Sequence, residues 1–234
     1  MQTRTVYLQQ LDDLGNSLDA MANAVAEGVR ASSNVFAWAA APADGWDGEV
    51  VPRFRSKIES VCLDIMLMQQ PLVAGDLRFV TGTFRIVSDL SHIGEKLTSV
   101  TTLAKRVPAG ELAGVAADLD AAAENVADMI AAAVGAFRAA DMEAANRVFA
   151  MDDAVDAAYE RVQQKVVALI RGSETDAEYL PELLMIAKYY ERMGDDAQRI
   201  AAWAVFRVTG EHATGESPMA GRAAGEHAIE SVDN

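Results

Sequence analysis

Two acidic side chains toward the C-terminal end of the sequence have the spacing of a pair on one helix face. Glu191 and Asp195 stand four residues apart in the segment YYERMGDDAQRIA, with Gly194 between them. Residues four apart lie on the same face of an α-helix, so the two carboxylates lie side by side. Gly194 costs a helix about 1 kcal/mol relative to alanine, and we expect it to let a neighbouring helix approach closely.

A second acidic pair precedes the first. Asp152 and Asp156 are also four residues apart. If their helix is a neighbour of the helix that carries Glu191 and Asp195, four carboxylates converge at the groove between the two helices. Four like charges at close range repel one another, and a bound cation removes this repulsion. Oxygen ligands suit Mg, Mn, Fe or Ca ions, so the spacing predicts a metal site at these four residues.

The same acids are also consistent with a solvated helix edge that binds no metal. Glu191 has Lys188 and Arg192 as neighbours for an ion pair, and Asp195 has Arg199 one turn away. Paired acids are common on exposed helix faces. Spacing alone leaves both interpretations open.

An altered copy of the motif stands one hundred residues upstream. Residues 93–95, Ile-Gly-Glu, repeat the Met-Gly-Asp of residues 193–195, but Ser91 stands at the position that corresponds to Glu191. A serine hydroxyl cannot supply the negative charge of a carboxylate. Three candidate ligands remain in this copy, Glu95 together with Asp89 and His92, which are three residues apart.

The segment that corresponds to the second acidic pair also departs from it. Arg55 aligns beside Asp156, and Asp152 corresponds to Val51 or Pro52. A metal site in the first copy must therefore be weaker or built differently from the site in the second copy.

Six helices must position these residues, because apolar side chains recur at helical spacing and strand signals are sparse. We expect helices over approximately 6–35, 52–70, 76–106, 111–140 and 142–171, and a last helix that is capped by Ser173 or Thr175 and ends near 209. The offset of 100 between the two motifs indicates three helices followed by three similar helices. Alanine-rich stripes favour close packing in an antiparallel bundle.

The repeat also predicts how the chain divides. We expect one three-helix repeat over residues 1–108 with the altered acidic motif, and a second over 111–210 with the intact motif. Residues 211–234 contain glycine, serine, proline and acids with almost no large apolar side chains. We therefore expect this tail to be disordered.

Composition excludes several classes of function. The net charge of −15 is unsuited to a general phosphate-contact surface for nucleic acid. It suits cations or basic partners instead. The single cysteine, Cys62, lies among apolar residues and cannot form a disulfide framework. No signal peptide and no apolar run of transmembrane length is evident, so we expect a soluble cytoplasmic protein.

The ordered set of motifs resembles the PhoU family of phosphate-uptake regulators. The segments that carry the resemblance are QQP (69–71), DLR (76–78), the DL..IGE segment (89–95), MDDAVDAAYERV (151–162), LLMIAKYYERMGDDAQRIA (183–201) and VTGE (208–211). No single motif is highly specific, but the ordered set, repeated at this separation, is fairly specific. The resemblance implies an all-α fold of two pseudo-symmetric three-helix bundles packed side by side.

The resemblance also implies metal clusters held at the surface by the acidic pairs, with Fe, Zn, Mn or Mg as candidate ions. Residue by residue, Glu191 and Asp195 match the family's motif, and Asp152 and Asp156 match its preceding acidic helix. The first copy departs at position 91 and at positions 51–55, which weakens the case for a metal cluster there.

For function, the resemblance implies an adaptor that is not an enzyme and lies peripheral to membrane complexes. Such a protein couples the ATPase subunit of a phosphate ABC transporter to a sensor histidine kinase. It holds the phosphate-starvation response off when phosphate is plentiful. We also expect a homo-oligomer, a dimer.

Two other readings of the sequence compete with this one. A di-metal oxidase in a helical bundle needs two Glu-x-x-His pairs. The three histidines are His92, His212 and His227, and the last two fall in the tail, so these pairs cannot be assembled. The other alternative is a structural helical bundle that binds partners but no metal and has diverged from phosphate signalling.

Overall fold

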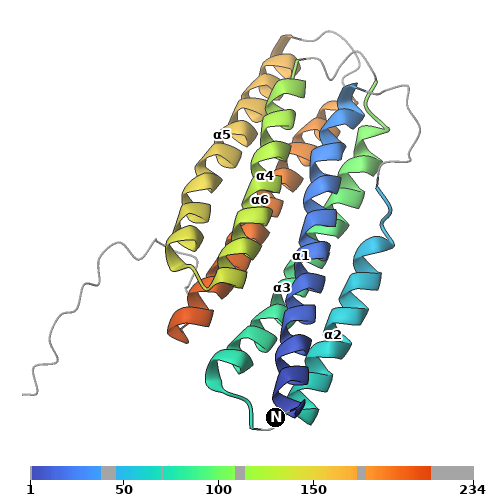
Figure 1. The fold of residues 1–234 in the computed structure, drawn as a ribbon. Coiled ribbons are helices and arrows are strands. Elements are labelled where there is room, and N and C mark those ends of the chain that lie inside the picture. The colour runs from blue at the N-terminus through green and yellow to red at the C-terminus, as the bar shows by residue number, and fades with distance from the viewer. Residues whose placement is uncertain (1, 38–45, 70, 109–113, 173–177, 212–234) are drawn as a thin grey trace, which may run out of the picture.

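The protein is a bundle of long helices (Figure 1). The computed structural model describes residues 2–37, 46–69, 71–108, 114–172 and 178–211, and no strand occurs in these ranges. The helices are α1 (Gln2–Ala37), α2 (Val50–Met68), α3 (Ala74–Ala104), α4 (Ala116–Ala139), α5 (Met142–Gly172) and α6 (Leu180–Thr209). The prediction of an all-α fold with six helices is confirmed. None of the described helices is long and apolar enough to cross a membrane.

The six helices form two three-helix bundles that lie side by side. In the first bundle α2 packs against α1 and α3, and in the second α5 packs against α4 and α6. The bundles meet where α1 contacts α4 and α3 contacts α6. Figure 1 shows α2 and α5 on the two outer flanks of the molecule. This arrangement places α5 beside α6, as the convergence of the acidic pairs requires.

One continuous hydrophobic core joins the two bundles. Small side chains make its centre tight, because α4 contributes fully buried alanines such as Ala123, Ala127 and Ala133. They let α4 pack closely against α1, α5 and α6 at once. Larger buried side chains such as Leu18 and Ile93 fill the remaining space. Each fully buried side chain of this size contributes about 1.5–3 kcal/mol.

The turn between α4 and α5 fixes the second bundle. Ala140 has a positive φ of 53°, and its N–H bonds back to the carbonyls of Ala136 and Phe137. Asp141 then accepts a hydrogen bond from the Ala144 N–H at 2.9 Å, which satisfies a free donor in the first turn of α5. α5 therefore reverses directly against α4.

Three helix starts differ from the prediction by about four residues or more. α1 begins at Gln2 rather than near 6. α4 begins at Ala116 rather than near 111, and residues 114–115 form a turn before it. α6 begins at Leu180 with Tyr179 as its N-cap residue and a proline in the first turn. The predicted caps, Ser173 and Thr175, lie outside the described residues, as do 212–234 of the tail that we expect to be disordered.

Candidate metal centre

Gly194 brings α5 and α6 into close contact at the predicted site. It is buried, and a Cβ atom added there would lie 2.7 Å from Asp152 Oδ1 and 3.6 Å from Val155 Cγ1. Any larger residue would displace the Asp152 carboxylate. The expectation that this glycine permits a close helix approach is therefore confirmed, and the approach places an α5 carboxylate directly over the α6 backbone.

Two carboxylate oxygens at this contact are buried without a hydrogen-bond partner. They are Asp152 Oδ1 and Glu191 Oε2. The other Glu191 oxygen, Oε1, accepts a hydrogen bond from Lys188 Nζ at 2.6 Å. A buried polar atom without a partner costs folding free energy. A cation between α5 and α6 would supply the missing interaction for both oxygens.

The pKa values indicate that the four predicted carboxylates lie within one another's electric field. Burial, and after it the charges of Asp156, Asp195 and Glu191, raise the pKa of Asp152 to about 6. Burial also raises the pKa of Asp156, as do Glu191 and then Asp195. The pKa of Asp195 is also raised, first by burial and then by the charge of Glu191. The facing sides of α5 and α6 therefore concentrate negative charge.

These carboxylates do not yet form a complete ligand set. Among the described residues, no three acidic, histidine or cysteine side chains lie close enough together to hold a metal ion. Asp156 and Asp195 are exposed, whereas Asp152 and Glu191 are partly buried. The residues fit a hard cation in their oxygen chemistry and their unpartnered atoms, and binding would require the exposed carboxylates to turn inward.

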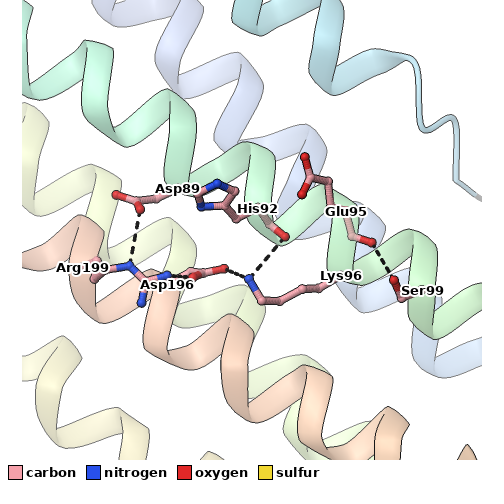
Figure 2. Close-up of polar contacts among 7 residues, drawn as sticks. All are labelled: Asp89, His92, Glu95, Lys96, Ser99, Asp196 and Arg199. Atoms are coloured by element: carbon pink, nitrogen blue, oxygen red, sulfur yellow. Dashed lines mark hydrogen bonds and ion pairs between the residues drawn. The ribbon is translucent and has the colours of Figure 1, made fainter.

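Of the three candidate ligands in α3, Glu95 points away from Asp89 and His92 (Figure 2). Asp89 faces α6, where Arg199 Nε lies 3.4 Å from its Oδ1. His92 is exposed, and its main-chain carbonyl accepts a hydrogen bond from Lys96. Glu95 is exposed and lines a pocket beside α2. The structure does not bring Asp89, His92 and Glu95 together.

The most deeply buried acid of this region is one that the spacing of the acidic pairs does not indicate. Asp196 is fully buried, and Lys96 Nζ from α3 donates to its Oδ2 at 2.6 Å. Arg199 also pairs with Asp196, besides its contact with Asp89 (Figure 2). The missed signal was the offset of 100, which places Lys96 and Asp196 at corresponding positions of two helices that pack together.

The alternative of a solvated, ion-paired edge holds in part. Lys188 pairs with Glu191, as that alternative expects. Arg199 pairs with Asp89 and Asp196 rather than with Asp195. Asp195 is thus left available at the groove, beside the unpartnered oxygens of Asp152 and Glu191.

The fold and the facing acids define a class: all-α proteins of two three-helix bundles with acidic pairs on two neighbouring helices, here α5 and α6. A family model described as the PhoU domain matches residues 119–204. A PhoU homolog 1 of Methanothermobacter thermautotrophicus is 30% identical over 155 residues, which cover 66% of this chain and 70% of that protein. The chain belongs to the PhoU family.

Another relative and two solved structures are also PhoU proteins. A phosphate-specific transport system accessory protein PhoU homolog of Clostridium acetobutylicum is 25% identical over 163 residues, covering 70% of this chain and 74% of the relative. Among solved structures, PhoU from Streptococcus pneumoniae aligns with a TM-score of 0.75 at 20% identity, over 89% of this chain and 99% of that one. PhoU from Pseudomonas aeruginosa aligns with a TM-score of 0.67 at 20% identity, over 88% and 97%.

Proposed function

We propose that this protein regulates phosphate uptake as an accessory protein of a phosphate-specific transport system. Membership of the PhoU family carries the proposal, because relatives from several organisms are named as accessory proteins of such systems. The protein acts by binding partners and not as an enzyme. It works at the cytoplasmic side of the membrane, peripheral to the transporter.

The finer proposal concerns the partners. The protein couples the ATPase subunit of a phosphate ABC transporter to a sensor histidine kinase and represses the phosphate-starvation response when phosphate is plentiful. It acts as a dimer. Long amphipathic helices and a net charge of −15 suit partners that present grooves or basic patches.

The proposal includes a metal ion held between α5 and α6. Asp152, Asp156, Glu191 and Asp195 would hold it, and the two unpartnered oxygens of Asp152 and Glu191 support this assignment. When bound, the ion supplies positive charge that offsets the carboxylates. The chain's own contribution is to present these acids on two helices held together at Gly194.

Complementation of a strain that lacks its own PhoU homologue tests the regulatory role. The full chain would be expressed in Caulobacter vibrioides that lacks its own PhoU homologue, and the uptake of radioactive phosphate would be measured in phosphate-rich medium. We expect uptake to fall toward the level of the intact strain. Affinity purification from the same cells should recover the transporter ATPase and a sensor kinase. Unchanged uptake with neither partner recovered would contradict the proposal.

Variants tested in the same strain distinguish a regulator that needs metal from a helical bundle that works without it. We expect Asp152→Ala and Glu191→Ala to bind Mn²⁺ at least about tenfold more weakly than the unaltered chain, and to restore repression poorly. Glu160→Ala, an exposed acid on α5, serves as the matched control. Full repression by both site variants would favour a helical bundle that works without metal.

A further inference from the structure

The first repeat contains a pocket where the second repeat has its acidic groove. The pocket has a volume of about 210 Å³ and lies between α2 and α3. Its walls include Val51 and Arg55 from α2, and Ser91 and Glu95 from α3. These four residues are the counterparts of the four acids in the second repeat, so the pocket is the structural equivalent of the candidate metal centre.

The glycines at the two helix contacts establish this equivalence. A Cβ atom at Gly94 would lie 3.0 Å from Val51 Cγ2, as a Cβ atom at Gly194 would lie 2.7 Å from Asp152 Oδ1. Each glycine thus receives a side chain from the second helix of its repeat. Val51 occupies in the first repeat the place that Asp152 occupies in the second.

The chemistry of the two places is opposite. Val51 offers no ligand atom, and the buried Ser91 hydroxyl already donates to the Val87 carbonyl at 2.7 Å. Arg55 Nε donates to Glu59 Oε1 at 2.8 Å, which holds a guanidinium at the wall of the pocket. Glu95 alone retains its carboxylate. A divalent cation would meet one free carboxylate, that of Glu95, and a guanidinium already paired with Glu59, whereas such ions require several oxygen ligands.

We propose that the first repeat is permanently free of metal because Val51, Arg55 and Ser91 stand in place of three of the four acids that would hold an ion between α5 and α6. This proposal rests on the proposed function, because it compares the first repeat with the metal site proposed between α5 and α6. It gives the chain a single metal centre and makes the two halves chemically unequal. One half responds to metal, and the other does not.

The test uses the full chain with Glu191→Ala, in which the second repeat is disabled. Binding of Mn²⁺ is measured by equilibrium dialysis and metal analysis. At a Mn²⁺ concentration that just saturates the unaltered chain, we expect E191A to bind well below one equivalent. Adding V51D, R55D and S91E places acids at all three altered positions, and we expect this variant to bind about one equivalent of Mn²⁺.

Two controls keep the result interpretable. Circular dichroism checks that the variant with V51D, R55D and S91E folds. If it does not, R55D/S91E in the same E191A chain is a second gain-of-site variant, because it retains the buried Val51. Arg53→Asp in the E191A chain makes the same charge change at an exposed position of α2. We expect R53D to gain no Mn²⁺.

Either of two results would overturn the proposal. One is Mn²⁺ bound by E191A that is lost when Glu95→Ala is added, because the first repeat would then bind metal unaided. The other is folded gain-of-site variants that bind no more Mn²⁺ than E191A. Absence of Mn²⁺ from the unaltered chain would instead count against the proposed function, and the gain-of-site comparison would still decide this inference.

Discussion

Asp152 combines an unpartnered buried oxygen with a pKa raised to about 6 from 3.8. The folded protein therefore holds this proton more tightly than the unfolded chain does. As a result, the free energy of unfolding decreases as pH rises through this interval. At neutral pH the charged Asp152 carboxylate lowers the free energy of unfolding of the metal-free protein, and a bound cation would offset that loss.

The pH dependence of stability tests this cost. Between about pH 5 and about pH 7, metal-free wild type should lose on the order of 1 kcal/mol more stability than Asp152→Asn, after allowance for solvent screening. Urea denaturation in a chelator would measure the difference. Parallel pH profiles for the two proteins would show that Asp152 titrates normally.

The two equivalent glycines provide a matched pair of substitutions. Gly194→Ala should lower the affinity for Mn²⁺ by roughly tenfold, because the new methyl group displaces the Asp152 carboxylate. Gly94→Ala meets Val51 instead and should leave the affinity unchanged. Isothermal titration calorimetry of both variants measures the contrast, and equal losses of affinity would contradict the assigned role of Gly194.

At the scale of the elements, the contact between α3 and α6 carries the buried pair of Lys96 and Asp196. Lys96→Met would leave Asp196 buried with only Arg199 as a partner. Removal of one member of a buried pair is costly, so we expect the free energy of unfolding to fall by about 2 kcal/mol.

An exposed pair provides the control. Arg147 and Glu143 lie one turn apart on α5 at 3.5 Å, with both side chains largely exposed. Arg147→Met should change the free energy of unfolding by less than about 1 kcal/mol. Urea denaturation compares the two variants, and similar losses for both would show that the buried pair has no special importance.

Periodicity predicted the existence and order of the helices because long apolar stripes leave little ambiguity. Helix starts were harder to predict. α6 begins at Leu180 with no side-chain cap bond, so the serine and threonine upstream gave a misleading signal. Where no cap marks a helix end, tertiary packing decides where the helix starts.

Parts of the candidate site were also predictable. The spacing of four residues placed Glu191 and Asp195 on one face, and Gly194 indicated a close helix contact. Asp196 was missed because adjacent acids on a helix point in different directions, and only the packed partner shows which one is buried. The unpartnered oxygen of Asp152 depends on the distance between α5 and α6, which sequence does not specify.

At the scale of the whole molecule, the two bundles share one hydrophobic core. Contacts of α1 with α4 and of α3 with α6 join the bundles along their length. Neither bundle can expose these faces without losing apolar burial. We therefore expect the halves to unfold together rather than as two separate units.

Tryptophan fluorescence can follow each half separately. Trp46 precedes α2 and Trp203 lies in α6. With Trp38 replaced by Phe, variants that retain only Trp46 or only Trp203 should unfold in urea with the same midpoint. Circular dichroism should give that midpoint as well. Two distinct midpoints would show that the halves are independent.

The pair of Lys96 and Asp196 makes the two halves of the chain complementary to each other. The two residues occupy corresponding positions, one hundred residues apart, and touch each other across the contact of α3 with α6. Two identical halves would have placed lysine against lysine or aspartate against aspartate at this point. With opposite charges here, each half complements the other but not a second copy of itself. A separated half paired with its own copy would bury like charges at this contact, whereas the two halves of one chain form an ion pair.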